Sequence, residues 1–195
     1  SGQWMDPELD PRTGDGPHTD ERPMLLDYLR YHRLTLQLKC DGLDAEQMAR
    51  RSVPPSSLSL LGLVRHLADV ERVWFREVLA GEDAPPHYWV DGNDEDFDGA
   101  VADDEVVAEA WRTWRSEVAH AEQLVETIAD LAEPVANRSR GSLVLREILI
   151  HLMIGSEGTL GFISEITYRT VPEHAHKASA LILFPDLATA CRAVT

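Results

Sequence analysis

Apolar residues recur every three or four positions in four stretches of the chain, which is the spacing of one face of an α-helix. The four stretches are residues 21–42, 57–81, 103–128 and 143–153. Since each apolar face must be buried against another, the pattern predicts a mainly α-helical protein in which four helices pack as a bundle.

Residues typical of helix ends mark the boundaries of these helices. Pro54-Pro55-Ser56 predicts a turn with an N-cap residue before the second helix, and Gly81 ends that helix. Asp103-Asp104-Glu105 begins the third helix with acidic residues where the helix dipole favours them. The polar residues 82–102 between these two helices therefore predict a long crossover.

The fourth helix does not end in the usual way. Gly155, Gly158 and Gly161 fall within seven residues, and each costs a helix about 1 kcal/mol relative to alanine. We therefore expect the helix to break near Ile154 and a short β/α tail to follow it. The apolar spacing beyond these glycines leaves a second outcome open, one unbroken helix over residues 143–169.

The pattern divides the chain into three parts. Residues 1–20 contain prolines and glycines among acidic residues and predict a flexible leader. Residues 21–153 contain the helical bundle, whose fourth helix is incomplete. Residues 154–195 form the C-terminal tail.

The acidic composition limits the classes of molecule that the protein is expected to bind. The 195 residues include 34 Asp and Glu against 18 Lys and Arg, a formal net charge of −16. Such a charge repels phosphate backbones and anionic lipid heads, so we expect neither nucleic acid nor a membrane as a partner. No apolar run reaches the roughly 20 residues that span a bilayer, and no signal peptide begins the chain. These features predict a cytoplasmic protein whose two cysteines, Cys40 and Cys191, stay reduced.

Six short segments form a recognisable series along the bundle. They are Asp41-Gly42-Leu43-Asp44, Val53-Pro54-Pro55-Ser56, Leu60-Leu61-Gly62-Leu63-Val64-Arg65-His66-Leu67-Ala68, Glu71-Arg72-Val73-Trp74-Phe75, Trp114-Arg115-Ser116-Glu117-Val118 and Leu145-Arg146-Glu147-Ile148-Leu149-Ile150-His151-Leu152-Met153. In this order they resemble the DinB-like superfamily, in the branch of mycothiol-dependent S-transferases and maleylpyruvate isomerases. The resemblance implies an up-down-up-down four-helix bundle with a long crossover between the second and third helices.

The resemblance also implies a metal site. In the resembled family a divalent metal, zinc or nickel, lies between a histidine on the second helix and a Glu/His pair spaced i, i+4 on the fourth. The second-helix histidine corresponds to His66, but the two fourth-helix positions correspond to Gly155 and Thr159. Neither residue can replace the lost ligand, so we expect no tightly bound metal and an absent or weakened metal-dependent activity. The other interpretation of His66 is a histidine satisfied by a neighbour such as Glu71 or a backbone carbonyl.

The residues after His151 follow a second pattern. Gly155-Ser156-Glu157-Gly158-Thr159-Leu160-Gly161 is followed by Pro172-Glu173-His174 and by the stretch from Ala180 to Leu187. These residues resemble the GSEGTLG motif and its context in FAD-linked oxidases of the D-2-hydroxy-acid dehydrogenase type, over about residues 151–195. The resemblance implies a chimera of two families and a flavin phosphate loop made of Gly155, Ser156, Glu157, Gly158, Thr159 and Gly161. Because the fragment lacks most of an FAD-binding domain, we do not expect it to bind FAD.

The crossover contains an acidic pattern. Residues 94–105 match the calcium-loop pattern D-x-[DN]-x-[DN]-G-x5-E from Asp94 to Glu105, with Gly99 at the turn position. Pro85 and Pro86 lie where the entering helix of such a site would be. We therefore expect a solvated acidic loop that begins the next helix, and calcium binding is the alternative.

Three functions follow from these observations. The first is a bundle of the thiol S-transferase type, which joins a small-molecule thiol to a small electrophile, with its metal-dependent activity lost or weakened. The second is a metal-free bundle that binds a small molecule or forms a homodimer. The third is a residual FAD-linked oxidase fragment. The sequence assigns no catalytic residue beyond His66, the surviving metal ligand of the resembled family.

Overall fold

The computed structural model describes residues 9–12, 18–52, 54–89, 93–132, 134–137 and 141–154. For 134–137, 141–143 and 150–154 it describes the backbone alone. The predicted β/α tail after Ile154, including the flavin-like loop at residues 155–161, lies outside the described residues.

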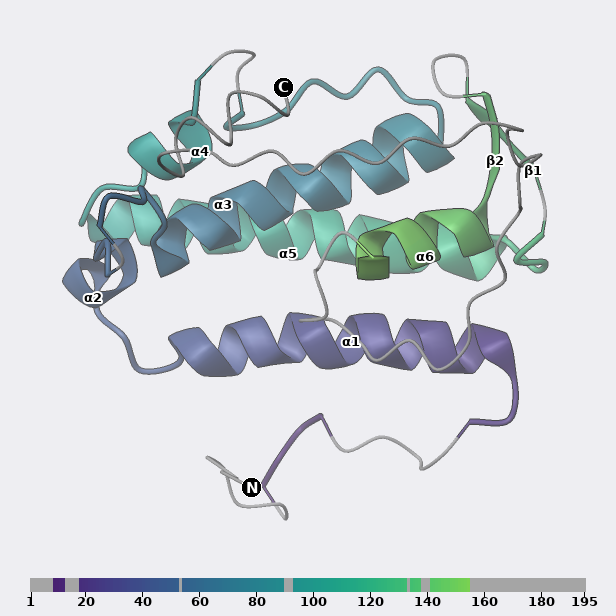
Figure 1. Ribbon diagram of the computed structural model, residues 1–195, viewed down its shortest axis with the longest axis horizontal. Helices are drawn as coiled ribbons and strands as arrows, with labels where there is room; N and C mark the ends of the chain where they lie inside the picture. The colour runs from purple at the N-terminus through teal and green to yellow at the C-terminus, as the bar shows by residue number, and fades with distance from the viewer. Residues whose placement is uncertain are drawn as a thin grey trace, which may run out of the picture. The chain divides into compact units, whose positions relative to one another are not determined.

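The described chain is mainly helical (Figure 1). The long helices are α1 (Glu21–Cys40), α3 (Leu60–Glu71), which continues as the π-helix η1 (Arg72–Leu79), α5 (Asp104–Thr127) and α6 (Leu145–Ile154). Between them lie two short helices, α2 (Ala45–Ala49) and α4 (Glu95–Asp98), and two strands, β1 (Pro134–Asn137) and β2 (Gly141–Val144). The prediction of a mainly helical bundle is confirmed, while the short elements are additions that apolar spacing did not predict.

Side chains that bind backbone amides fix the starts of two long helices. Asp103 accepts hydrogen bonds from the amides of Glu105 and Val106, so α5 begins where the acidic residues predicted. Ser59 caps α3 by accepting a hydrogen bond from the amide of Gly62 at 3.1 Å. The second helix therefore begins after Ser59 and not directly after the predicted cap, Ser56.

Two apolar clusters fill the bundle, one toward each end. One cluster contains Cys40, Leu61, Val64, Ala110 and Trp114, and the other contains Leu25, Phe75, Val78, Ala121 and Val125. The first residues of α3 thus pack beside the first residues of α5, and the residues of η1 beside the end of α5. The start of α1 lies in the cluster that holds η1, so α1 runs opposite to α3.

The direction of α5 corrects the predicted up-down-up-down order. Because the crossover runs back along α3 before α5 begins, α3 and α5 point the same way (Figure 1). α6 then runs in the direction of α1 (Figure 1). The bundle is helical as predicted, but its second and third long helices are parallel.

The fourth long helix follows a β-hairpin. β1 and β2 pair antiparallel, with Pro134 opposite Val144. Leu145 and Ile148 of α6 are fully buried in the cluster that contains η1. Since α6 extends to Ile154, the last described residue, its break there stays a prediction.

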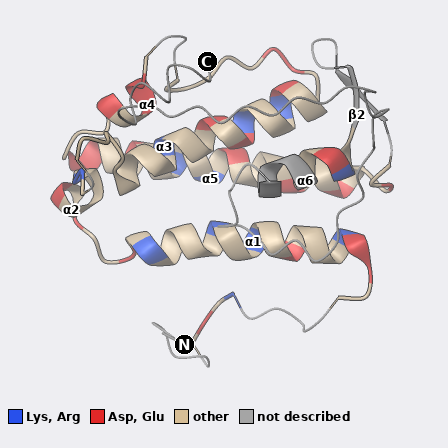
Figure 2. Ribbon diagram, viewed as in Figure 1, with Lys and Arg blue, Asp and Glu red and all other residues tan. Residues whose placement is uncertain are grey.

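Charged residues occur along each of α1, α3 and α5 (Figure 2). No helix in the described part of the chain combines the length and apolarity that are needed to cross a membrane.

Candidate functional site

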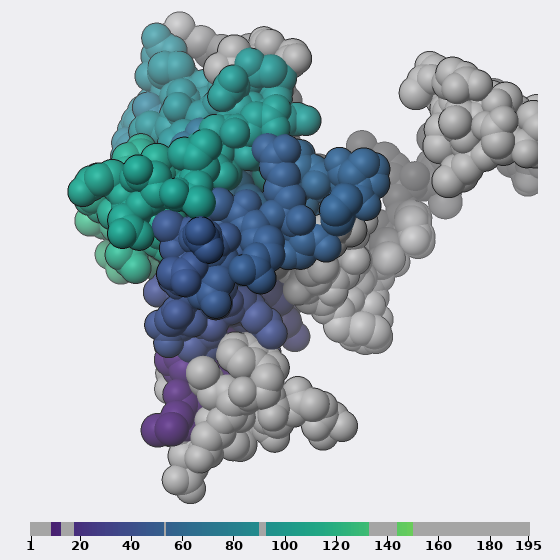
Figure 3. Space-filling model, turned by 90° about the vertical axis from the view of Figure 1, so that its left-hand side faces the viewer, coloured from purple at the N-terminus to yellow at the C-terminus, as the bar shows by residue number. Residues whose placement is uncertain are grey.

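His66 lies on α3, and its imidazole contacts α4. Figure 3 shows the end of the bundle at which α2 and α4 lie. The Nδ1 atom of His66 is 2.7 Å from Oδ2 of Asp96, an α4 residue whose side chain is 3% exposed. The imidazole also stacks on Phe97, with ring centroids 5.5 Å apart. The His66 side chain is still 44% exposed, so part of the ring remains accessible.

Arg65 holds α4 on α3. Its Nε atom donates to the carbonyl oxygen of Asp96 at 2.8 Å, and Nη2 donates to that of Glu95 at 3.0 Å. Gly62 allows the close approach, because a Cβ atom there would lie 2.5 Å from Cδ1 of Phe97. These contacts explain how a helix of four residues places a buried carboxylate on His66.

The pair with Asp96 fixes how His66 can act. The carboxylate accepts a hydrogen bond, so in the neutral imidazole the proton lies on Nδ1 and the lone pair on Nε2. Histidine ligands in metal sites are commonly oriented by a carboxylate in this way, and a histidine with a structural role is satisfied by the same bond. Both interpretations of His66 fit this geometry.

Glu71 is not the partner of His66, which corrects the predicted neighbour. Its carboxylate accepts two hydrogen bonds from Arg33 of α1, from Nε at 2.7 Å and from Nη2 at 2.6 Å. The two side chains are only 10% and 9% exposed, so this bidentate ion pair ties α1 to α3 inside the bundle. The carboxylate of Glu71 therefore binds Arg33 and not His66.

The described residues do not make up a metal site of the resembled type. His66 and Asp96 supply one imidazole and one carboxylate, and each is the partner of the other. In the described part of the chain there is no group of three or more His, Cys, Asp or Glu side chains that could hold a metal ion. Positions 155 and 159, to which the resemblance assigns the other two ligands, lie outside that part.

Three acidic residues of the crossover and of the start of α5 have separate partners. Asp96 meets His66, Asp98 pairs with Arg51 at 2.9 Å, and Asp103 caps α5. Asp96 is 2% exposed and lies in the short helix α4, so the prediction of a solvated loop is wrong at this residue, whereas Asp94, Glu95 and Asp98 are exposed. The physical reason is that the charge-assisted bond to the imidazole compensates the desolvation of this carboxylate. Calcium binding by residues 94–105 stays a prediction.

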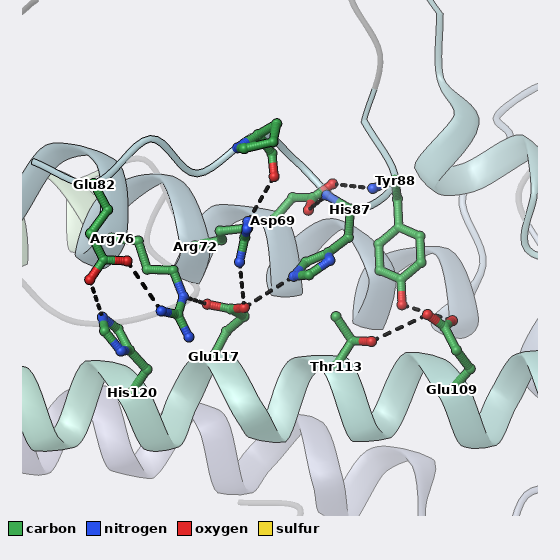
Figure 4. A network of polar contacts seen from close by, with 11 residues as sticks. Asp69, Arg72, Arg76, Glu82, His87, Tyr88, Glu109, Thr113, Glu117 and His120 are labelled. Atoms are coloured by element: carbon green, nitrogen blue, oxygen red, sulfur yellow. Dashed lines mark hydrogen bonds and ion pairs between the residues drawn. The ribbon is translucent and has the colours of Figure 1, made fainter.

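A second polar network joins η1, the crossover and α5 (Figure 4). At its centre lies Glu117 of α5, whose side chain is 4% exposed. Glu117 accepts hydrogen bonds from Nη1 of Arg72 at 2.9 Å, from Nε of Arg76 at 2.6 Å and from Nε2 of His87 at 3.0 Å. Burial acts to raise the pKa of Glu117, but the bonds from His87 and Arg76 outweigh it and hold the pKa below its usual value.

Asp69 of α3 holds the same crossover segment (Figure 4). Its carboxylate accepts hydrogen bonds from three successive backbone amides, those of His87, Tyr88 and Trp89, at 2.6, 2.9 and 2.7 Å. The hydroxyl of Tyr88 donates to Glu109 at 2.8 Å. Burial raises the pKa of Tyr88 to about 12, so this hydroxyl keeps its proton at neutral pH. The segment is thus fixed to both α3 and α5.

The sequence reasoning missed these buried acids, although the sequence contains a signal for them. Glu117 lies on the same face of α5 as the buried residues Ala110, Trp114, Ala121 and Val125. An acidic residue within an apolar stripe must be buried together with a partner, because an unpaired buried charge is strongly unfavourable. The stripe therefore indicates a polar network, though not which residues complete it.

Comparison with known proteins agrees with the resemblance over the bundle. The model of the mycothiol-S-transferase family matches residues 24–156, about two thirds of the chain. No curated protein and no solved structure matches it. The matched residues include His66 and all helices from α2 to α6. The chain therefore belongs to the mycothiol-S-transferase family, which is DinB-like.

Proposed function

We propose that this chain is a bundle of the thiol S-transferase type whose metal-dependent activity is lost or weakened. Reactions of this type join a small-molecule thiol to a small electrophile, with a metal that stabilises the thiolate. The observation that carries the proposal is the ligand set, in which His66 is present while the fourth-helix positions contain Gly155 and Thr159. Glycine has no side chain and threonine offers only a neutral hydroxyl, so neither is the ligand that zinc or nickel needs there.

The setting of His66 supports this proposal. Its Nδ1 atom is bonded to the buried carboxylate of Asp96. Turning the imidazole away would leave that carboxylate without this hydrogen bond, at a cost of about 1–3 kcal/mol or more. Nε2 is then the ring atom left for a ligand, and one imidazole alone falls short of the three protein ligands of catalytic zinc sites.

A second candidate function is a metal-free bundle that binds a small molecule or forms a homodimer. The network around Glu117 favours it, because the ion pairs with Arg72 and Arg76 hold α5 against η1 without a metal. Because these ion pairs do not involve a metal, we expect the bundle to stay folded without one. A metal-free binding protein requires such a fold.

The flavin-like loop remains a prediction from the sequence. The family match ends at Ser156, and residues 155–161 lie outside the described part of the chain. We expect no flavin in the purified protein, since one phosphate loop buries too little of so large a ligand. Absorbance in the flavin bands that survives gel filtration would contradict this expectation.

Metal content tests the leading proposal. The wild type, purified without chelator, is expected to contain far less than one zinc or nickel ion per chain. The double variant Gly155→Glu/Thr159→His restores both missing ligand types, and we expect it to gain metal and the ability to transfer a thiol to a small electrophile. His66→Ala in that background is the matched control and should abolish both gains.

Two results would contradict the proposal. Near-stoichiometric metal in the wild type that His66→Ala removes would mean that other side chains complete the site. Thiol transfer by the wild type that survives exhaustive chelation would favour a metal-free mechanism. A thiol that raises the melting temperature without being transferred would favour the second candidate, because a ligand stabilises the state that it binds.

A further inference from the structure

A cavity of about 440 Å³ lies between the C-terminal half of α1 and the first half of α5. Small-molecule pockets in proteins have volumes of roughly 300–1,000 Å³. The residues that give the cavity its chemistry are Leu34, Gln37, Leu38, Asp41, Trp111 and Arg115. They belong neither to the contacts of His66 nor to the network of Glu117, so the cavity is a separate feature of the bundle.

The apolar lining of the cavity comes from both α5 and α1. Trp111 packs edge-on against Trp114, with ring centroids 5.5 Å apart, and Trp114 is only 2% exposed. Leu34 and Leu38, which lie four residues apart on α1, add aliphatic surface. An indole held in place by its neighbour favours contact with a planar apolar ligand.

The α5 side of the cavity also carries a positive charge. Arg115 follows Trp111 by one helical turn, and its guanidinium carbon lies 5.3 Å from the centroid of the Trp111 ring. Arg115 is exposed, and within the described residues it forms no ion pair. A guanidinium that contacts a ring in this way leaves its N–H donors available, and a pair of these donors matches the two oxygens of a carboxylate.

Residues at the end of α1 limit the charge of a ligand. Asp41, at the end of α1, lines the cavity and repels a second negative charge. Gln37 adds an amide that can donate and accept hydrogen bonds. Cys40 also lines the cavity, but burial raises the pKa of its thiol to about 11, so the thiol is protonated and unreactive at neutral pH. A ligand here is held without a covalent bond and with a single negative charge.

We propose that this cavity binds a small aromatic monocarboxylate, with its ring against Trp111 and its carboxylate on Arg115. Four residues separate the two positions, about 6 Å along the helix axis, so a short arm between ring and carboxylate allows both contacts. The proposal goes beyond the S-transferase function, because it involves neither His66 nor a metal.

Calorimetric titration of the full chain with phenylpropanoate tests the proposal. The neutral phenylpropanamide is the matched ligand, and Arg112→Gln is the matched control for Arg115→Gln, since Arg112 is also exposed on α5 but does not line the cavity. The acid should bind about tenfold more tightly than the amide. Arg115→Gln should raise the Kd of the acid about tenfold, and Arg112→Gln less than about twofold.

Three outcomes would overturn the proposal. The amide could bind as tightly as the acid, which would exclude a carboxylate contact. The two arginine variants could lose affinity equally, which would indicate a general effect of charge. The acid could give no saturable heat at millimolar concentration. Thermal melting of the ligand-free variants checks that both retain the wild-type fold. None of these results depends on the metal content of the protein, which is the test of the proposed function.

Discussion

Replacement of Glu117 by glutamine is expected to destabilise the protein strongly. Glu117 is the carboxylate to which Arg72, Arg76 and His87 all donate hydrogen bonds. Glutamine has the same shape, but it carries no charge, and its amide nitrogen would place a donor against these donors. The two arginine side chains, 18% and 22% exposed, would then lose a buried counter-charge.

The expected loss in the free energy of unfolding depends on how deeply the arginine partners of Glu117 are buried. Removing one member of a buried ion pair typically costs about 3–5 kcal/mol. Because the arginines are partly exposed and Arg76 keeps a bond to Glu82 at 3.2 Å, we expect the lower end, about 3 kcal/mol. For a chain of this length each kcal/mol lowers Tm by about 2–4 °C, so the expected fall in Tm is roughly 6–12 °C.

Urea unfolding followed by circular dichroism measures this change in the free energy of unfolding. The matched control is Glu122→Gln on the same helix, because the Glu122 side chain is 59% exposed and its loss should cost at most about 1 kcal/mol. The pKa of Glu117 in the folded protein lies below its usual value of 4.5. Its carboxylate therefore stabilises the fold above pH 4.5, and this contribution is lost as the pH falls through the lower pKa of the folded state.

Two results would refute this reasoning. The first is equal stability of Glu117→Gln and Glu122→Gln. It would mean that the hydrogen bonds to Glu117 add nothing to the free energy of unfolding beyond what bonds to water would supply. If the difference between wild type and Glu117→Gln stayed constant well below pH 4.5, the carboxylate would not have the lowered pKa that its cationic partners imply.

Three other properties can be checked with similar methods. Millimolar calcium should leave Tm nearly unchanged, because the central carboxylate of the acidic pattern, Asp96, is buried; a rise of several degrees that Asp94→Ala removes would contradict this. Gly62→Ala should cost about 1–3 kcal/mol in urea unfolding, since its Cβ would lie 2.5 Å from Cδ1 of Phe97; unchanged stability would mean that α4 shifts freely. Cys40, buried and with its pKa raised to about 11, should be alkylated only after unfolding, and peptide mass spectrometry that finds it labelled in the folded protein would disprove this.

The long helices could be predicted because burial of one helical face is a pattern that repeats locally. The third helix was predicted to start at Asp103, and Asp103 is the N-cap of α5. The fourth was predicted over residues 143–153, and α6 extends from Leu145 to Ile154. In both cases several turns repeat the same apolar face, so the period is visible in the sequence alone.

The setting of His66 could not be predicted in the same way, because it depends on contacts between distant residues. His66 and Asp96 are 30 positions apart. α4 has four residues, too few to show a helical period. Its place on α3 is fixed by the contacts of Arg65 with its carbonyl oxygens, which exist only when both helices have formed.

The direction of α5 was missed because the up-down-up-down order was taken from the family resemblance and not from the length of the crossover. Short connections force neighbouring helices to be antiparallel, but a long crossover does not. α3 and η1 together are roughly 30 Å long, a distance that about ten extended residues can cover. The crossover after Leu79 is long enough to return along the whole of this helix, so a parallel arrangement is allowed.

The crossover is held by buried carboxylates, and this determines what surrounds His66. Asp69 binds three backbone amides of the crossover, and Asp96 brings its later part onto His66. An irregular segment has backbone donors that apolar side chains cannot satisfy, whereas one carboxylate accepts several of them. The described contacts of His66 therefore come from α4 and not from the fourth helix. The proposed replacement of the fourth-helix ligands by Gly155 and Thr159 would therefore leave the bond between His66 and Asp96 in place.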